Sequence, residues 1–476
     1  MSALESLSAI ATPPRLRDDG CPSVSVALLE NGKVSTRTLL AEKSHTKHVD
    51  PETIYQAASI SKPITGLACA KLIEQGLFSY DTRVVDHLPE DIIHVISDEQ
   101  NLPLLKQVTV AHLLSHTSGL SQGGFPGYDR EPIPSDEQIL SGKAPANTVR
   151  VRFDTFPGGQ YSYSGGGMTV LQVFLEEVTK IPFAEMMQKT VLNPLGMTRS
   201  HFGDLDKGEK NYATAHLTAE VEANAPYHVL PELAAAGLWT TPTDLLRAVA
   251  AVQTSLRGER KAFLDKETAK KMLTQIGTAD GKKGAAMGWG ADEAVFAHSG
   301  GNLPGFKCYC VGSHGGAANA TGEAAELKLP EGCGVAVMTN SWEGFQTVQK
   351  VVSAVWYLRD WPRFGSLSKG FSKDDIVPYP TAHEVDGEGW KAWVGKWGDW
   401  RLLDEDGGPR IGYGEAGETL GLVVGAAPKR KVTDGREGYR LVVDGMRLFV
   451  QLDWEDGERV VVLTQGERGS KVLKRS

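Results

Sequence analysis

Alternating hydrophobic and polar residues occur in two groups that lie far apart along the chain. Near its start, residues 21–29 alternate as a strand, Asn31-Gly32 is typical of a tight hairpin turn, and residues 33–40 predict the partner strand. A later group of strand-like segments comprises residues 296–298, 306–311 and 334–338. We therefore expect one antiparallel sheet assembled from both ends of a domain.

Helical spacing of apolar residues prevails between these two groups. It predicts helices over residues 59–76, 109–115, 168–180 and 263–275, and a terminal helix over residues 344–361. Thr243-Asp244 predicts the cap of one more helix. Residues 312–332, rich in Gly and Ala, predict a loose connection between two strands. The expected fold class is α+β, an antiparallel sheet with a helical insertion.

The pattern changes in the last quarter of the chain, where short alternating segments are separated by turn sequences. These turns lie at residues 405–407, 433–435 and 455–457. We expect residues 1–365 to form the first domain, residues 366–387 a linker, and residues 388–476 a small all-β barrel or sandwich. Three roles fit this second domain: covering the cleft, limiting substrate size, or forming the interface of a homodimer.

Composition narrows the class of protein. The 476 residues are 41% hydrophobic and 23% charged, with a net charge of −9 and both signs interspersed. That balance is typical of a globular protein and offers no basic patch to nucleic acid. No apolar run approaches the roughly 20 residues of a membrane span, and the start of the chain lacks the pattern of a secretory signal. We expect neither nucleic-acid nor membrane partners.

The five cysteines are odd in number and unevenly spaced, and no zinc-binding spacing occurs: Cys21, Cys69, Cys308, Cys310 and Cys333. We interpret them as buried free thiols in a reducing compartment, which favours the cytoplasm. His45 and His48 lie three residues apart without an accompanying carboxylate motif, and are interpreted as loop histidines. We expect no metal and no cofactor.

Candidate chemistry begins at Ser59 and Lys62, which form a Ser-x-x-Lys motif at the predicted start of a helix. Residues three apart lie on the same helical face, so the two side chains are expected to be neighbours. A serine hydroxyl becomes a useful nucleophile when an adjacent base takes its proton, and a lysine with a lowered pKa is such a base. The motif is common, however, and Ser59 also fits a simple helix cap.

Three further motifs follow in chain order: Leu113–Leu120 (Leu-Leu-Ser-His-Thr-Ser-Gly-Leu), Tyr163-Ser164-Gly165, and His298-Ser299-Gly300 with Gly301 after it. With Ser59-Ile60-Ser61-Lys62, they make the chain resemble the serine β-lactamase and penicillin-binding-protein superfamily over roughly its first 360 residues. The resemblance is to the branch of class C β-lactamases, D-amino-acid-specific peptidases, family VIII carboxylesterases and fungal transesterases. It implies a β-lactamase/transpeptidase-like sheet with a helical insertion.

The resemblance also implies roles. Ser59 is the expected nucleophile, Lys62 its base or proton relay, and Tyr163 the group that passes a proton to the leaving group. The N–H groups of Ser59 and Gly301 are expected to form the oxyanion hole. The other residues implied on the substrate side are His298, Ser299, Gly300 and Gly165.

Two positions depart from the family pattern. Gly165 stands where the third residue of Tyr-x-Asn supplies an amide, and His298 stands where many β-lactamases have a lysine. A mostly neutral imidazole is a poorer partner for a carboxylate than an ammonium. Both changes favour small esters or lactones over penicillins and cell-wall peptides.

Several other residues have competing interpretations. Ser121 lies in a Gly-x-Ser-x-Gly sequence, but a helix precedes it and a Pro/Gly-rich loop follows, which is the wrong context for an α/β-hydrolase elbow. His116 is interpreted as a structural loop histidine that bonds to the backbone. Trp239 and Trp289 are assigned either to the pocket wall or to the core, with core packing expected for at least one.

Three functional hypotheses follow. The first is a metal-independent serine hydrolase that forms an acyl-enzyme on Ser59 with a small-molecule acyl substrate, with esters or lactones expected first and amides or β-lactams second. The second is an acyltransferase or transesterase on the same site, in which an acceptor replaces water. The third is a non-catalytic binding protein that keeps the fold, favoured only by Gly165 in place of an asparagine.

Overall fold

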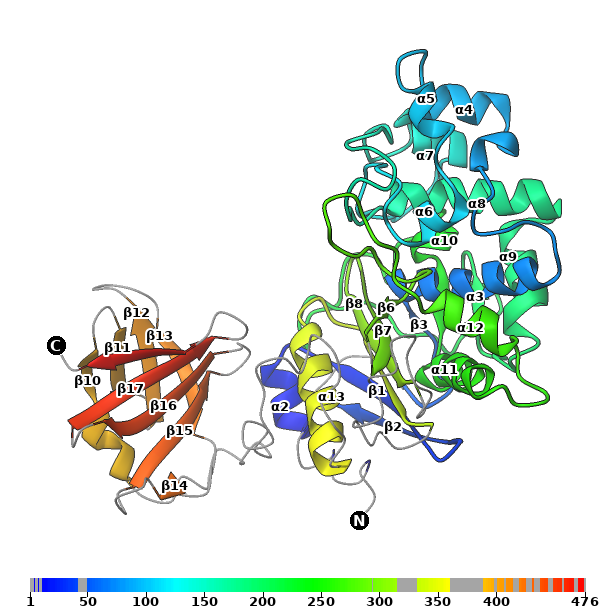
Figure 1. Cartoon of the computed structure of the whole chain (residues 1–476). Coiled ribbons are helices and arrows are strands. Elements are labelled where there is room, and N and C mark those ends of the chain that lie inside the picture. Colours follow the sequence, from blue (N-terminus) through cyan, green and yellow to red (C-terminus); the bar gives the residue numbers. More distant parts are fainter. Residues whose placement is uncertain are drawn as a thin grey trace. The chain divides into compact units, whose positions relative to one another are not determined.

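The structure is a computed structural model, shown in Figure 1, and contains two compact units, Met1–Val352 and Ser353–Ser476. The described residues are 4, 7, 11–41, 49–292, 294–314, 332–359, 388–397, 400–405, 408–413, 419–424, 430–431, 437–443, 448–455, 458–465 and 470–474. The predicted linker, most of the predicted loose connection and the predicted turns of the last quarter lie wholly or partly outside them.

A six-stranded antiparallel sheet forms the centre of the first unit, in the order β2-β1-β9-β8-β7-β6. Its strands are β1 (Ser23–Glu30), β2 (Lys33–Leu40), β6 (Gly290–Ala291), β7 (Val295–Asn302), β8 (Phe306–Ser313) and β9 (Gly334–Thr339). β1 and β9 pair directly, so the two ends of the unit meet in the middle of the sheet. This confirms the expected α+β sheet built from both ends.

The helices of the insertion agree in type with the sequence pattern, but several begin elsewhere. They are α3 (Ser61–Glu74), α4 (Glu90–Ile96), α5 (Leu102–Leu105), α6 (Val110–Leu114), α7 (Asp136–Ser141), α8 (Gly165–Thr179), α9 (Phe183–Met187), α10 (Leu233–Ala236), α11 (Pro242–Arg257) and α12 (Lys266–Met272). The expected cap at Thr243-Asp244 is wrong: Thr241 caps α11 by accepting the Asp244 N–H, and Pro242 occupies the first turn. α12 begins late because Asp265 caps it.

Helices cover the sheet. α11 packs on β1, β8 and β9. Figure 1 shows α2 (Pro13–Asp18) beside the start of α13 (Phe345–Arg359). The Lys350 ammonium bonds to the Asp19 carboxylate at 2.6 Å, and the Thr347 hydroxyl donates to the same carboxylate at 3.3 Å. These contacts join the beginning and the end of the first unit on the sheet.

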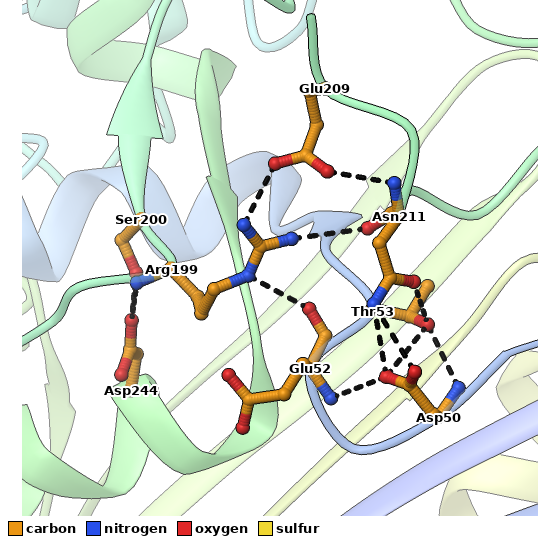
Figure 2. Close-up of polar contacts among 8 residues, drawn as sticks. All are labelled: Asp50, Glu52, Thr53, Arg199, Ser200, Glu209, Asn211 and Asp244. Carbon is orange, nitrogen blue, oxygen red and sulfur yellow. Dashed lines mark hydrogen bonds and ion pairs between the residues drawn. The ribbon is translucent and has the colours of Figure 1, made fainter.

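A second, three-stranded sheet, ordered β3-β5-β4, leads the chain toward the nucleophile motif. Its strands are β3 (Tyr55–Gln56), β4 (His201–Phe202) and β5 (Leu238–Thr240). Figure 2 shows how Arg199 joins the segment that precedes β3 to the segment that follows β4: its guanidinium donates to the Glu52 carbonyl at 3.0 Å and to the Glu209 carboxylate at 2.8 Å. The Asp244 carboxylate accepts the Arg199 N–H at 2.9 Å, which ties this network to α11.

Aromatic side chains fill the core next to this small sheet. Trp239 is 2% exposed and makes edge contacts with the rings of Tyr212, Tyr227 and Phe306. Trp289 is equally buried, against Phe296. Both tryptophans are therefore core residues, and neither forms a pocket wall. The five cysteines are all free and buried, as expected.

The second unit contains an antiparallel sheet in the order β10-β11-β12-β13-β15-β16-β17-β18, with β14 paired to β15. The strands are β10 (Gly395–Trp397), β11 (Trp400–Glu405), β12 (Gly408–Tyr413), β13 (Thr419–Val424), β14 (Arg430–Lys431), β15 (Glu437–Val443), β16 (Leu448–Glu455), β17 (Glu458–Gln465) and β18 (Ser470–Lys474). The expected all-β character is confirmed. The described strands form an up-and-down meander without a pair between β10 and β18, so no closed barrel is present among them.

None of the helices in the described part of the chain combines the length and the apolar character that crossing a bilayer requires.

The close packing of α3 against residues 287–288 allows a stability prediction. A Cβ at Gly66, in the middle of α3, would come within 3.0 Å of the Met287 carbonyl oxygen, which is backbone and cannot swing aside. Gly66→Ala should therefore lower the free energy of unfolding by about 1–3 kcal/mol, although alanine is the better helix former. Chemical denaturation measures the change.

Gly208→Ala is the control, because Gly208 is exposed and its added Cβ would meet nothing within 4 Å. A Gly66→Ala protein as stable as the parent would contradict the close packing of α3 against residues 287–288.

Candidate functional site

Ser59 and Lys62 lie where a short 3-10 turn, η1 (Ala58–Ile60), continues into α3. The Lys62 Nζ donates a hydrogen bond to the Ser59 Oγ at 3.1 Å. The expectation that one helix begins at Ser59 is wrong in one detail, because residues 58–60 form a 3-10 turn and the regular helix starts at Ser61. Ala58 has a φ of +49°, which lies outside the right-handed helical region and costs on the order of 1–3 kcal/mol.

The Lys62 side chain is buried, with 2% of its surface exposed. Its Nζ also donates to the carbonyl oxygen of Ala235, in α10, at 2.7 Å. Burial lowers the pKa of Lys62 from 10.5 to about 7, because the ammonium form loses its hydration. A substantial fraction of the side chain is therefore a neutral amine near pH 7, as a general base must be.

Tyr163 completes this group from a segment about a hundred residues later. The Lys62 Nζ lies 4.9 Å from the centre of the Tyr163 ring. Burial raises the pKa of Tyr163 to about 12, and a side-chain hydrogen bond with Ser59 opposes this rise. The phenol therefore keeps its proton at neutral pH. The hydroxyl, the amine and the phenol that the motifs singled out meet in one place.

Strand β7 approaches the nucleophile through Gly300. A Cβ at this position would come within 3.0 Å of both the Ala57 carbonyl oxygen and the Cys308 Sγ. The Cys308 thiol itself donates to that carbonyl at 3.1 Å. A glycine at position 300 is what allows the strand to lie against the turn that carries Ser59.

The backbone N–H of Gly301 points to an open edge of β7. In the hairpin between β6 and β7, the Asp292 N–H donates to the Val295 carbonyl oxygen at 2.9 Å. The backbone N–H and carbonyl groups of Val295 therefore point to the side of β7 on which β6 lies. Backbone groups two residues apart in a strand point to the same side. The backbone groups of Ser299 and Gly301 therefore point to the same side of β7 as those of Val295. The pairing with β6 ends at Ala297, so this side is open at Ser299 and Gly301, and both residues are exposed. An oxyanion donor and a substrate-pairing edge both require exposed backbone groups that no neighbouring strand pairs with.

His298 lies on the same side of the site as Tyr163, with 6.2 Å between the ring centres. Its Nδ1 donates to the Ser299 carbonyl oxygen at 2.6 Å. Burial, followed by the nearby positive charge of Lys62, lowers the pKa of His298 from 6.5 to about 4. The imidazole is therefore neutral at pH 7 and offers no cation to a substrate carboxylate.

Gly165 begins α8 and faces a filled space. A Cβ there would lie 2.9 Å from the Phe125 ring and 3.3 Å from the carbonyl oxygen of Gln122. The loop over residues 122–125 thus occupies the position into which an asparagine side chain would project. The asparagine side chain that the family motif has at this position is absent, and the loop over residues 122–125 fills the space that it would occupy.

Ser121 lies in a different setting. Its Oγ accepts the Arg152 N–H at 3.0 Å, and its carbonyl oxygen accepts the Ser164 hydroxyl at 2.9 Å. In the described chain, α6 precedes it and a loop follows until α7. An α/β-hydrolase elbow requires a strand before the serine and a helix after it. The structure therefore gives Ser121 a backbone-tethering role.

Sequence patterns did not reveal several groups that hold the site together. The Lys62 acceptor is a main-chain carbonyl, which no side-chain motif encodes. Asn302, at the end of β7, is buried and donates to Gln56 Oε1 at 3.0 Å and to the Ala236 carbonyl at 3.2 Å. Because Asn302 directly follows Gly301 and Gln56 is three residues before Ser59, this bond links the two expected oxyanion donors.

Across the described ranges, no cluster of three or more His, Cys, Asp or Glu side chains is arranged to hold a metal ion.

The lowered pKa of Lys62 predicts how the free energy of unfolding changes with pH. Between about pH 7 and pH 10.5, unfolded Lys62 carries a proton that the folded form lacks. The unfolded state then binds more protons, so this residue's contribution to stability rises with pH across that window. Lys62→Met removes the effect, so its stability relative to the parent should fall by a few kcal/mol from pH 7 to pH 10.

Denaturation at a series of pH values measures this difference, and Lys33→Met, at an exposed position on β2, controls for the loss of a lysine. A constant difference between Lys62→Met and the parent across the window would contradict the lowered pKa.

Comparisons with known proteins agree with this architecture. The computed structure is similar to that of an octameric penicillin-binding-protein homologue from Pyrococcus abyssi, with a TM-score of 0.58 and 20% identity over 100% of both chains. It is also similar to a D-stereospecific amidohydrolase from Streptomyces sp., with a TM-score of 0.52 and 19% identity over 74% of this chain and 98% of that one.

Among curated sequences, the chain is similar to Protein flp of Staphylococcus aureus (strain NCTC 8325 / PS 47), with 26% identity over 229 residues, or 47% of this chain. The match spans only 42% of that relative's length. The profile of the Beta-lactamase family matches residues 11–353, which is most of the chain. The chain therefore belongs to the Beta-lactamase family, and this membership supports a serine hydrolase in general terms.

Proposed function

We propose that this protein is a serine hydrolase that forms an acyl-enzyme on Ser59 and acts on small, uncharged esters or lactones. The observation that carries the proposal is the buried Lys62 amine, 3.1 Å from the Ser59 hydroxyl and with a pKa of about 7. A base with a pKa near the working pH combines the correct protonation state with a strong drive for proton transfer.

In the acylation step, the neutral Lys62 amine takes the Ser59 proton while Oγ attacks the ester carbonyl. The carbonyl electron pair moves onto oxygen, where the Ser59 and Gly301 N–H groups stabilise the negative charge. When the tetrahedral intermediate collapses, the C–O bond to the leaving group breaks and Tyr163 donates its proton to the departing alkoxide. The phenol then recovers a proton from the Lys62 ammonium.

Deacylation reverses these roles with water as the nucleophile. The Lys62 amine takes a proton from water as the water oxygen attacks the acyl carbonyl. When the tetrahedral intermediate collapses, the C–O bond to Ser59 breaks and the Lys62 ammonium returns the proton to Oγ. None of these steps needs a metal, so we propose a metal-independent mechanism.

Two features of the pocket support uncharged esters over peptides and penicillins. The neutral His298 imidazole supplies no cation for a carboxylate, and the Gln122–Phe125 loop excludes an amide side chain at Gly165. A site that lacks these partners gains little from a substrate carboxylate or from the peptide group beside it. The relatives that act on amides therefore need not share this chain's substrates.

The quaternary state and location are proposed separately. We propose a small-molecule acyl donor as the substrate and a homodimer as the assembly, since the structurally similar Pyrococcus abyssi protein is octameric. The five buried free thiols support a reducing compartment, which favours the cytoplasm.

Substitution of the nucleophile tests the proposal directly. Ser59→Ala should reduce turnover of a chromogenic short-chain ester by at least about 10⁴-fold, because the Ser59 Oγ is the hydroxyl to which Lys62 Nζ donates a hydrogen bond in the described site. Ser121→Ala should keep at least half of the parent rate. Thermal unfolding of both variants checks that the fold is retained.

A fluorophosphonate probe extends this test to the non-catalytic alternative. The parent protein should be labelled on Ser59, and Ser59→Ala should not be. Full activity in Ser59→Ala, or activity lost only in Ser121→Ala, would refute the assignment of the nucleophile. An unlabelled and inactive parent would favour a binding protein.

His298→Lys tests the preference for uncharged substrates. An ammonium at this position should raise kcat/KM for a carboxylate-bearing donor such as nitrocefin, relative to a neutral ester, by about fivefold to tenfold. His94→Lys, at an exposed position on α4, is the matched control and should leave the ratio unchanged. An unchanged ratio in His298→Lys would show that His298 does not face the substrate carboxylate.

A further inference from the structure

His116 lies directly behind the proposed proton donor. It follows α6 in the Leu-Leu-Ser-His-Thr-Ser-Gly sequence, is 1% exposed and adopts a φ of +57°. Histidine is among the few non-glycine residues that are enriched in this left-handed conformation. The conformation turns the side chain and the carbonyl group of the same residue toward the segment that carries Tyr163.

The backbone N–H groups of the two residues on either side of Tyr163 both bind to this one residue. The Ser162 N–H donates to the His116 carbonyl oxygen at 2.8 Å. The Ser164 N–H donates to the His116 Nδ1 at 3.2 Å. The backbone of Tyr163 is therefore fixed on each side by a residue almost fifty positions earlier in the chain.

The imidazole also supports the Tyr163 ring. The two ring centres are 4.4 Å apart with a tilt of 42°, which is direct packing contact. Since Nδ1 accepts a hydrogen bond, the proton of the neutral ring is on Nε2, and this atom is buried without a hydrogen-bond partner among the described residues.

The charge state of the ring agrees with a supporting role. Burial, with the positive charges of Lys62 and His298, keeps the pKa of His116 well below its ordinary value. The ring is therefore neutral when Lys62 is protonated, and adds no charge that would disturb the proton transfers of Ser59 and Tyr163.

We propose that His116 is a positioning residue. It holds the Tyr163 phenol within reach of Ser59 and of the leaving group of the substrate. The inference rests on the proposed function and extends it, because it assigns a task to a residue first interpreted as structural. Misplacement of a reacting group by about 1 Å costs on the order of 10²-fold in rate. Loss of the contacts by which His116 holds Tyr163 should therefore lower kcat.

Two substitutions distinguish the effect of the His116 side-chain hydrogen bond from the effect of the positive φ at this position. Glycine accepts the positive φ but has no acceptor for the Ser164 N–H, whereas asparagine tolerates this φ and carries Oδ1 at the place of the histidine Nδ1. His116→Gly should lower kcat for a chromogenic ester by about 10²-fold with KM changed less than about threefold. His116→Asn should recover at least about tenfold of that loss.

A double-mutant cycle with Tyr163→Phe shows whether the loss passes through the phenol. If His116 acts on Tyr163, the His116→Gly change should cost less than about threefold in single-turnover rate once the phenol hydroxyl is gone. Thermal unfolding of each variant confirms that folded protein is compared.

The outcomes are distinguishable from failure of the proposed function. A Tyr163→Phe protein with the parent rate would refute the proton-donor role of Tyr163 and with it the proposed mechanism. Equal losses in His116→Gly and His116→Asn, or the same loss in His116→Gly with and without the Tyr163 hydroxyl, would overturn the positioning role alone. An unchanged kcat in folded His116→Gly would also overturn it.

Discussion

The burial of one ammonium-bearing side chain governs the chemistry of this protein. Lys62 is 2% exposed, and two acceptors lie within hydrogen-bond distance of its Nζ, the Ser59 hydroxyl and the Ala235 carbonyl. Water is the strongest stabiliser of the charged form, so its exclusion brings the pKa of the amine to about 7. The nucleophile, the phenol and the open edge of β7 gain their proposed roles from standing next to this base.

Excluding water requires backbone segments to approach one another more closely than side chains normally allow. Gly66 brings α3 against the Met287 carbonyl, and Gly300 brings β7 against the Ala57 carbonyl. On the side of the site near Tyr163, the absence of a Cβ at Gly165 likewise leaves room for the loop that carries Phe125. The site is therefore assembled by two close approaches of main chain and, at Gly165, by a close approach of the Phe125 ring, and each depends on the absence of a Cβ.

Membership of the Beta-lactamase family and the departures from its motifs are compatible. The proton-handling group beside Ser59 is retained, while the two altered positions, Gly165 and His298, lie on the side of the substrate. A neutral imidazole and a filled amide position change which acyl donor is held and leave the proposed acylation step in place.

The sequence by itself determined the features that depend on neighbours along the chain. Alternation predicted the hairpin of β1 and β2 and the later strands, and the three-residue spacing of Ser59 and Lys62 predicted their contact. Local patterns failed at the exact starts of two helices. Thr241 rather than Thr243 caps α11, and a 3-10 turn over residues 58–60 delays the start of α3.

Only the tertiary structure decided the pKa of Lys62, its Ala235 acceptor and the loop that fills the space beside Gly165. The same holds for the double hold of His116 on the Tyr163 segment. Periodicity records which face of an element is apolar, but desolvation and main-chain hydrogen bonds arise where segments far apart in sequence meet. Those meetings depend on the packing of the whole unit, and no single stretch of residues encodes them.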